Sequence, residues 1–408
     1  MPAFEQAYTD AIEAKILPGY ALLAGDKHGQ TLHASAAGVQ SLKPGSTRPF
    51  QLDTVCAIAS MTKLMTAIAA LQCVERGLLD LDASVKDRLP GIARYGIITG
   101  FDDEKNEAVL TPEATPITLR MLLAYTNGHE YDALSPLLTK WRASRGETPG
   151  AGSTVEQKST LPLVFAPGTS WRYGAGSDWA GKLIERASGQ TLETFMRAHI
   201  WTPLGISDMT FFPHARPAMA ARLATISTLD AQGAGPAADA PDFDILTGGT
   251  ECLGGVGAYA STAAYFPLLQ AVLRRDTALL SPASWTELLR PQLDARCKAE
   301  FNAYLTSSPL HMQYLGMGLP ASVVKTWSFA GMVCEEGVEG RMGKGAVMWG
   351  GLPSMAWWVD SEAGLCGVAA CQVMPPMAPV VMALHEGFQR GVYGEYGMGV
   401  EVESKESR

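Results

Sequence analysis

The tetrapeptide Ser60-Met61-Thr62-Lys63 opens an apolar segment whose spacing predicts a buried helix. The larger side chains of this segment recur at nearly helical spacing, with alanines between several of them: Met61, Leu64, Met65, Ile68 and Leu71. Gly77, directly after Arg76, supplies a stop signal, so we expect a helix from about residue 60 to residue 76. Residues three apart share one face of a helix, so Lys63 is able to bring its amine to the Ser60 hydroxyl.

Ser60 and Lys63 together form a candidate nucleophile and base. A serine hydroxyl is a poor nucleophile unless a base accepts its proton, and a free lysine, with a pKa of about 10.4, is protonated at neutral pH. At the start of a helix, the macrodipole and the unpaired N–H groups favour a developing alkoxide and disfavour an ammonium. Both effects favour neutral Lys63 as the proton acceptor. The alternative is structural, with a capping serine and a lysine whose stem lies along apolar surface.

The composition predicts a globular protein of the cytoplasm. The chain has 408 residues, of which 47% are hydrophobic, so it is able to bury a core large enough for two lobes. Its seven cysteines include no C-x-x-C pair and stand mostly among apolar residues, which is typical of reduced thiols in an intracellular protein. Residues 1–15 predict a polar amphipathic helix rather than a signal peptide, and no long uninterrupted apolar run occurs. We therefore expect neither export nor a membrane partner.

Charge and motif content argue against several other classes of protein. A net charge of −9 argues against nucleic acid as a partner, because phosphates require a basic face. The seven histidines are scattered without metal-binding spacing, so we expect no metal site. We find neither a P-loop nor a dinucleotide fingerprint, and we expect no cofactor. The absence of G-x-S-x-G excludes the strand-elbow nucleophile of the α/β-hydrolases.

Short strand-like segments at both ends of the chain predict one antiparallel sheet. Residues 19–24 and 31–36 are apolar runs separated by a Gly-containing turn, which fits a β-hairpin. Three later apolar segments are separated by Gly and Pro breakers, namely residues 346–349, 355–360 and 365–373. Apolar residues at helical spacing follow them from residue 380 to residue 390. The expected fold class is α/β, an antiparallel sheet flanked by helices.

The middle of the chain predicts an inserted, mainly helical lobe, because its helical patches are joined by long stretches rich in Gly, Pro and Ser. We assign residues 1–80 and 246–408 to the α/β sheet domain and residues 81–245 to the lobe. Two segments are expected to be surface loops, residues 145–158 and residues 231–241.

Two later segments offer the further groups that acyl transfer by Ser60 requires, a proton shuttle and an oxyanion hole. In Pro167-Gly168-Thr169-Ser170-Trp171-Arg172-Tyr173, a turn leads into an aromatic run whose last residue is a candidate to hydrogen-bond Ser60 and Lys63 and to carry the proton. In Trp349-Gly350-Gly351-Leu352, the two glycines let a strand edge approach a substrate, and the backbone N–H groups of Leu352 and Ser60 are candidate oxyanion donors. The structural alternatives are a core tyrosine and a simple β-bulge.

These three segments, in this order and at these separations, resemble the serine β-lactamase and penicillin-binding-protein superfamily, and specifically its class C and esterase branch. The resemblance covers most of the chain and includes Ile117-Thr118-Leu119-Arg120-Met121-Leu122-Leu123, Phe165-Ala166-Pro167-Gly168, Pro203-Leu204-Gly205-Ile206-Ser207-Asp208-Met209 and Gly254-Gly255-Val256-Gly257. It implies the β-lactamase/transpeptidase-like fold, with Ser60 as nucleophile, Lys63 as base and Tyr173 as partner base and acid.

The resemblance also implies a substrate pocket between the two lobes. Its walls would include Tyr131, Trp349 and Trp357 against the acyl or acceptor group, beside Gly350 and Gly351. For Tyr131 and Trp357, a purely structural place in the core is equally consistent with the sequence.

The sequence also departs from the usual motifs of this family. Ala175 stands where penicillin-interacting enzymes carry an asparagine, and Trp349-Gly350-Gly351 replaces their Lys-Thr-Gly strand. The carboxylate of a β-lactam would therefore lose the cation that holds it, which argues against lactamase or peptidase activity and favours ester or thioester substrates.

The resemblance implies a serine acyltransferase that moves an acyl group from an ester or thioester, through acyl-Ser60, to a hydroxyl of a polyketide-like secondary metabolite. An acyl carrier protein domain is a candidate thioester donor. The first alternative is a carboxylesterase that hydrolyses the ester side chain of such a metabolite, and the second is a catalytically silent binding protein. Exclusion of water and positioning of the alcohol distinguish transfer from hydrolysis, and the sequence does not reveal either.

Overall fold

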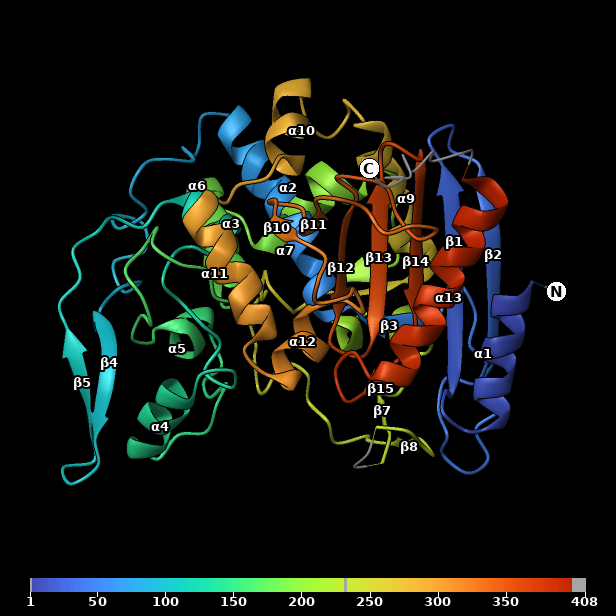
Figure 1. Ribbon diagram of the computed structural model, residues 1–408, viewed down its shortest axis with the longest axis horizontal. Helices are drawn as coiled ribbons and strands as arrows, with labels where there is room; N and C mark the ends of the chain where they lie inside the picture. The colour runs from blue at the N-terminus through green and yellow to red at the C-terminus, as the bar shows by residue number, and fades with distance from the viewer. Residues whose placement is uncertain (1, 231–232, 398–408) are drawn as a thin grey trace, which may run out of the picture.

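A seven-stranded antiparallel sheet joins the two ends of the chain, in the order β10-β11-β12-β13-β14-β1-β2 (Figure 1). Its N-terminal strands are β1 (Gly19–Asp26) and β2 (Thr31–Gly38). Its C-terminal strands are β10 (Lys325–Trp327), β11 (Met332–Cys334), β12 (Val347–Gly351), β13 (Met355–Asp360) and β14 (Leu365–Ala370). Because β1 pairs with β14, the predicted sheet shared by the two ends is confirmed. The computed structural model describes residues 2–230 and 233–397.

Helices cover both faces of this sheet. Figure 1 shows α1 (Ala3–Glu13) and α13 (Pro379–Tyr396) together on one face, and α9 (Thr262–Arg274) packs against β1, β13 and β14. Seven of the eight residues of β1 are buried, as expected for a strand covered on both sides. The long apolar helix of the sequence is also present, as the turn η1 (Ala59–Met61) followed by α2 (Thr62–Glu75).

The segment between residues 81 and 245 contains helices and short strands. Its helices are α3 (Leu119–Ala124), α4 (Pro136–Ser144), α5 (Val155–Ser159), α6 (Gly176–Ser188), α7 (Leu192–Met196), η2 (Arg197–Trp201), η3 (Pro213–Ala215) and α8 (Pro217–Ala220). Its strands are β4 (Ile97–Asp102), β5 (Glu107–Thr111), β6 (Met209–Thr210), β7 (Ser227–Thr228) and β8 (Ala238–Asp239). The division of the chain into residues 1–80 with 246–408, and 81–245, stays a prediction.

Small sheets connect this segment with the rest of the molecule. β6 pairs with β9 (Tyr259–Ser261), which pairs in turn with β3 (Val55–Ala57), and β7 pairs with β15 (Val373–Met374). Three more helices follow α9, namely α10 (Pro282–Leu289), α11 (Ala295–Thr306) and α12 (Pro309–Leu315). The ring of Phe301 on α11 packs against Trp171, 4.3 Å away between ring centroids.

Both segments that were predicted as loops contain a short helix or strand. α5 occupies the end of the predicted loop 145–158, because Thr154 and Gln157 form a capping box that starts a helix there. β8 occupies residues 238–239 of the predicted loop 231–241, whose first two residues lie outside the described residues. All seven cysteines are buried and unpaired, as the sequence predicted for core thiols. No helix within the described parts of the chain is both long and apolar enough to cross a membrane.

Candidate active site

Ser60 lies in a strained turn directly before α2. Ala59, which precedes it in η1, has a φ of 43°, a left-handed conformation that an alanine rarely adopts. Thr62 Oγ1 donates to the Ala59 carbonyl at 2.6 Å and fixes the turn from inside. The adjacent strand β12 fixes it from outside, because a Cβ on Gly351 would lie 2.4 Å from the carbonyl oxygen of Ile58. The position of Ser60 is therefore held by packing on both sides.

Lys63 reaches Ser60 from the first turn of α2. Its Nζ lies 3.1 Å from Ser60 Oγ, 2.8 Å from the carbonyl oxygen of Gly255 and 3.4 Å from Tyr131 Oη. The side chain is only 3% exposed, so the alternative of a lysine that extends its ammonium into water is wrong. The three hydrogen-bond partners of Lys63 are uncharged oxygens.

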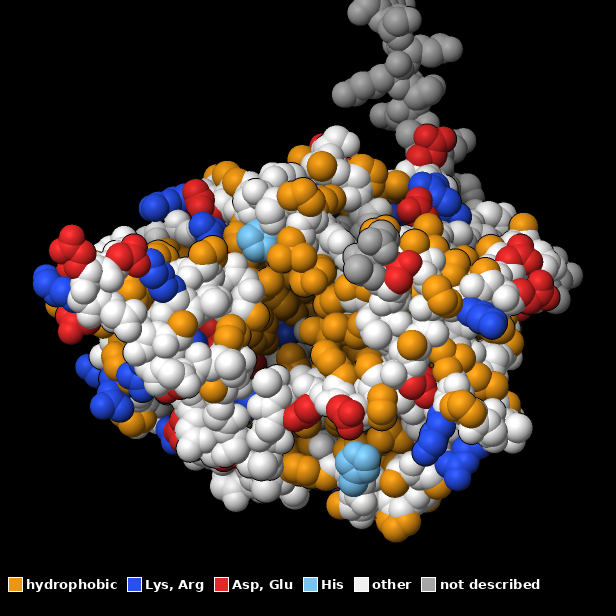
Figure 2. Space-filling model, turned by 90° about the horizontal axis from the view of Figure 1, so that it is seen from below, with side chains coloured by type: hydrophobic (Ala, Val, Ile, Leu, Met, Phe, Trp, Pro, Cys, Tyr) orange, Lys and Arg blue, Asp and Glu red, His pale blue; other side chains and the backbone are white. Residues whose placement is uncertain are grey.

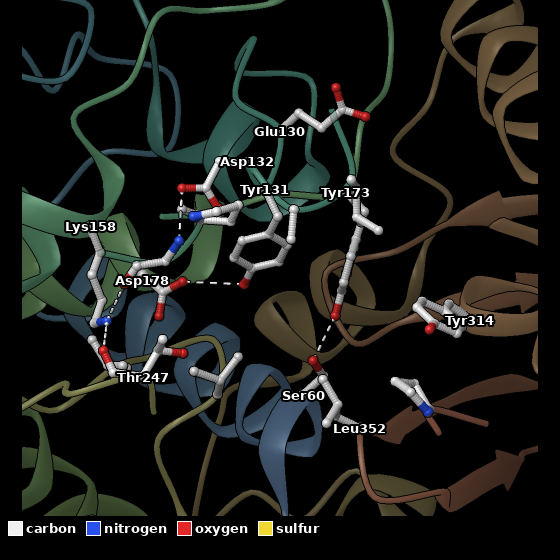
Figure 3. A pocket seen from close by; sticks show the side chains of 18 of the residues that line it. Ser60, Glu130, Tyr131, Asp132, Lys158, Tyr173, Asp178, Thr247, Tyr314 and Leu352 are labelled. Atoms are coloured by element: carbon white, nitrogen blue, oxygen red, sulfur yellow. Dashed lines mark hydrogen bonds between the residues drawn. The ribbon is translucent and has the colours of Figure 1, made fainter. Parts of the chain in front are cut away.

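Tyr173 also reaches Ser60, and Figure 3 shows the hydrogen bond between the two side chains. Its hydroxyl donates to Ser60 Oγ at 2.7 Å and accepts from Trp349 Nε1 at 3.3 Å. Its ring also faces Lys63, because Lys63 Nζ lies 4.7 Å from the ring centroid. The predicted hydrogen bonds of Ser60 with Lys63 and with Tyr173 are present, whereas Lys63 meets the ring of Tyr173 and not its hydroxyl. The roles of the three residues in catalysis stay predictions.

Asp178 is a buried acid of the site that the sequence reasoning missed. One carboxylate oxygen accepts a hydrogen bond from the Tyr131 hydroxyl at 3.2 Å, and the other accepts one from the backbone N–H of Gly255 at 2.8 Å. Burial raises the pKa of Asp178, and the nearby charge of Lys63 opposes that rise. Burial, together with Asp178, raises the pKa of Tyr131 well above its ordinary value. From the sequence, Asp178 is only an acidic residue in the first turn of a helix, a common feature with no catalytic meaning.

Ser60 and Tyr173 form part of the wall of a cavity of about 330 Å³, which opens on the face shown in Figure 2. Apolar side chains form much of this wall, among them Leu161, Leu253, Val256, Leu315 and Met377. Figure 2 shows the hollow surrounded by hydrophobic atoms. The predicted residues Tyr131, Trp349, Gly350 and Leu352 also line it. An apolar wall with reactive groups at one end suits a substrate with a hydrophobic body.

Two residues predicted to bind substrate do not line the cavity. Trp357 is 1% exposed on β13 and lies opposite Trp349 of β12, one strand further into the sheet. Gly351 faces the turn before Ser60, so its missing side chain permits the packing of two backbone segments. Neither residue therefore forms part of the cavity wall, and their contact with a substrate stays a prediction. Across the described residues, no cluster of three or more His, Cys, Asp or Glu side chains suits a metal ion.

The sheet, its covering helices and the serine turn beside an apolar cavity define a serine-enzyme fold of the β-lactamase type. The family model described as Beta-lactamase matches residues 4–389, and the chain therefore belongs to the beta-lactamase family. This result confirms the resemblance and the expected fold class.

Two relatives and one solved structure show which members of that family the chain is similar to. It is 36% identical to the monacolin J acid methylbutanoyltransferase of Aspergillus terreus over 401 residues, which are 97% of this chain and 96% of the relative. It is 35% identical to the lovastatin esterase of Penicillium rubens over 397 residues, which are 96% and 98% of the two chains. Among solved structures, the LovD6 mutant of simvastatin synthase from Aspergillus terreus superimposes with a TM-score of 0.88 at 35% identity, covering 97% of this chain and 95% of the other. Named acyltransferases and a named esterase are thus similar to the whole chain, which supports the predicted enzyme class.

Proposed function

We propose that this protein is a serine acyltransferase that moves an acyl group from an ester or thioester, through acyl-Ser60, to a hydroxyl of a polyketide-like metabolite. The observation that carries the proposal is the position of Ser60 Oγ, 3.1 Å from Lys63 Nζ and 2.7 Å from Tyr173 Oη, at the wall of an apolar cavity. The named activities of the relatives support the same substrate class.

The contacts of Lys63 orient it as a base. A neutral amine has two N–H groups and one lone pair. When the N–H groups donate to the Gly255 carbonyl and to Tyr131 Oη, the lone pair faces the Ser60 hydroxyl. Asp178 supports this arrangement because its carboxylate accepts a hydrogen bond from the Tyr131 hydroxyl. The lone pairs of the tyrosine oxygen then remain free to accept a hydrogen bond from Lys63.

Acylation then follows from these positions. Ser60 Oγ forms a bond with the donor carbonyl carbon while its proton passes to Lys63. The oxyanion forms beside the backbone N–H groups of Ser60 and Leu352, which are the proposed donors that stabilise it. As the bond from the carbonyl carbon to the leaving oxygen or sulfur breaks, Tyr173 supplies a proton to the leaving group and is reprotonated from Lys63. An acceptor hydroxyl reverses these steps and releases the new ester.

Hydrolysis is the second candidate function, because the same acyl-enzyme reacts with water if no alcohol is bound. The similarity to a named esterase, at nearly the same identity as to a named transferase, is the observation that supports this candidate. A carrier-protein thioester as the donor, and a cytoplasmic location, are further parts of the proposal.

Intact-protein mass spectrometry after brief exposure to a panel of acyl esters and acyl thioesters tests the proposal. We expect an acyl adduct on the wild type and none on Ser60→Ala, while Ser144→Ala, a serine of α4, controls for the loss of a hydroxyl elsewhere. Release of the adduct by added alcohols rather than by water would assign transfer, and rapid loss in water would assign hydrolysis. Retention of turnover by Ser60→Ala would refute the proposal.

A further inference from the structure

The direction of the Tyr173 ring is set by the side chains packed around it. A tyrosine side chain has no hydrogen-bonding atom other than its hydroxyl, and both side-chain hydrogen bonds of Tyr173 are made by that group. Figure 3 shows the side chain extended toward Ser60, so a tilt of the ring moves the hydroxyl away from the serine. The neighbouring rings therefore determine whether the tyrosine proton lies within reach of a leaving group.

Tyr125 is the nearest aromatic neighbour of Tyr173, among the described residues, that the site has not yet included. Its ring centroid lies 5.6 Å from that of Tyr173, whereas the centroid of Trp171 lies 6.3 Å away. Tyr125 follows the last residue of α3, is 2% exposed and does not line the cavity. It therefore acts on a bound substrate only through other side chains.

Four aromatic rings from separate segments form a closed circuit around this contact. Tyr125 packs edge-on against Trp327 of β10, with 5.2 Å between ring centroids. Trp327 packs edge-on against Trp349 of β12 at 4.7 Å, and its Nε1 donates to the Leu123 carbonyl at 3.2 Å. Trp349 closes the circuit, because it packs against Tyr173 at 5.3 Å and donates to its hydroxyl. In a close-packed interior, the displacement of one ring shifts the others.

The hydroxyl of Tyr125 connects this circuit with the start of α6. Tyr125 Oη lies 2.6 Å from Ser177 Oγ, and both side chains are buried. Ser177 stands in the first turn of α6, directly before Asp178. The Tyr125 backbone has a left-handed conformation with a φ of 60°, which is uncommon for a large side chain, and its carbonyl accepts from the backbone N–H of Arg172 at 3.3 Å. Tyr125 is thus held at both its side chain and its backbone.

From this geometry we propose that Tyr125, fixed by Ser177, is a positioning residue that holds the Tyr173 hydroxyl where it protonates the leaving group. Burial raises the pKa of Tyr125 well above its ordinary value, so its own hydroxyl stays protonated and takes no part in proton transfer. The inference rests on the proposed function, since it concerns the step that forms acyl-Ser60.

The test compares two esters that share one acyl group, chosen from those that acylate Ser60, and differ only in the leaving group. A 4-nitrophenolate ion leaves without a proton, whereas an ethoxide must be protonated as it leaves. The ratio of kcat/KM for the 4-nitrophenyl ester to kcat/KM for the ethyl ester therefore reports the acid alone. Tyr173→Phe is the reference for its loss, and it should raise this ratio at least about thirtyfold.

Tyr125→Leu removes the ring and should raise the same ratio about tenfold, because the acid remains but is misplaced. Tyr125→Phe keeps the ring and loses only the bond to Ser177, so the ratio should return to within about threefold of the wild type. Ser177→Ala breaks the same bond and should match it. Tyr393→Leu is the control, since this tyrosine of α13 is also buried and donates to Asp360 at 2.6 Å; its ratio should equal that of the wild type.

Combining Tyr125→Leu with Tyr173→Phe shows whether Tyr125 acts through Tyr173. Once the acid is absent, Tyr125→Leu should lower kcat/KM for the two esters equally, so the ratio should remain that of Tyr173→Phe alone. A further rise of the ratio in the double variant would overturn the proposal, as would a wild-type ratio in Tyr125→Leu.

The remaining outcomes separate this proposal from the proposed function. If Tyr125→Leu does not fold, the conservative Ser177→Ala still decides, because a ratio equal to that of the wild type would overturn the role of the pair. A selective loss in Tyr173→Phe without one in the Tyr125 and Ser177 variants would refute the positioning role alone. Absence of any Ser60-dependent turnover would refute the proposed function, and the positioning role with it.

Discussion

Lowering the pH from 7 to 5 should destabilise the folded protein by about 2 kcal/mol through His385 alone. His385 lies in α13 at 3% exposure, with Nδ1 2.6 Å from Tyr8 Oη and Nε2 2.6 Å from the carbonyl oxygen of Ser354. The carbonyl requires a proton on Nε2, so Nδ1 accepts from Tyr8 and the ring is neutral. Burial lowers the pKa of His385 from 6.5 to about 4.

The sign follows from the two pKa values. Between pH 6.5 and pH 4 the unfolded chain binds the proton that the folded chain excludes, so stability falls as the pH falls. The loss attributable to this histidine is about 0.2 kcal/mol at pH 7 and about 2 kcal/mol at pH 5. His129, whose pKa is also lowered to about 4 by burial, adds a similar loss, so the wild type alone does not isolate His385.

Urea unfolding at both pH values, followed by tryptophan fluorescence, separates the two contributions. His385→Gln stays neutral at every pH and retains a donor for the Ser354 carbonyl, so its loss of stability between pH 7 and 5 should be smaller than that of the wild type by about 2 kcal/mol. His28→Gln, in the exposed turn between β1 and β2, controls for removal of a histidine as such. Equal losses in the wild type and in His385→Gln would refute the reasoning. Because Ser354 follows the proposed oxyanion residue Leu352 by two positions, ester hydrolysis by the variant should be measured in the same series.

Three substitutions test the site itself. Asp178→Asn should hydrolyse a neutral ester at least tenfold more slowly than the wild type, because the single amide oxygen cannot accept from both Tyr131 and the N–H of Gly255; a fully active variant would contradict the proposed orientation of Lys63 through Tyr131. Gly351→Ala should lose about 2 kcal/mol of stability in urea, because the new Cβ would lie 2.4 Å from a backbone oxygen. Gly387→Ala in α13, where the new Cβ would meet open space, should be nearly neutral. Equal stabilities of the two variants would contradict the tight packing at Gly351. Trp349→Phe removes the 3.3 Å donor to the tyrosine hydroxyl and should lower kcat about fivefold with little change in KM; an unchanged kcat would show that this hydrogen bond is dispensable.

The parts of the site that the sequence predicted are those set by local spacing or by the family resemblance. Ser60 and Lys63 are three residues apart on one helical segment, so their contact follows from helix geometry alone. Tyr173 lies 113 positions further along the chain, so its own segment made it only a candidate partner of the serine, and the resemblance supplied the connection. The strands at both ends of the chain were predicted because each has its own alternation and turn signals.

The parts that could not be predicted depend on which segments are neighbours in space. The partners of Asp178 are a side chain 47 positions away and the backbone N–H of Gly255, and no local pattern marks either contact. The resemblance implied that Trp357 lines the pocket, whereas the strand order puts this residue on β13, one strand further into the sheet than Trp349. A backbone acceptor such as the Gly255 carbonyl has no side-chain signature at all.

The choice between transfer and hydrolysis must depend on the cavity wall rather than on the fold or the serine turn. A named transferase and a named esterase share 36% and 35% identity with this chain over nearly its whole length, so overall similarity does not separate the two outcomes. The cavity opens to solvent on the face shown in Figure 2, so water reaches an acyl group on Ser60 unless an acceptor occupies the space. Transfer then exceeds hydrolysis only when acceptor binding both displaces that water and aligns the hydroxyl with the acyl carbon. The apolar residues that line the cavity beside Ser60 are therefore the positions at which this protein would be tuned toward one outcome or the other.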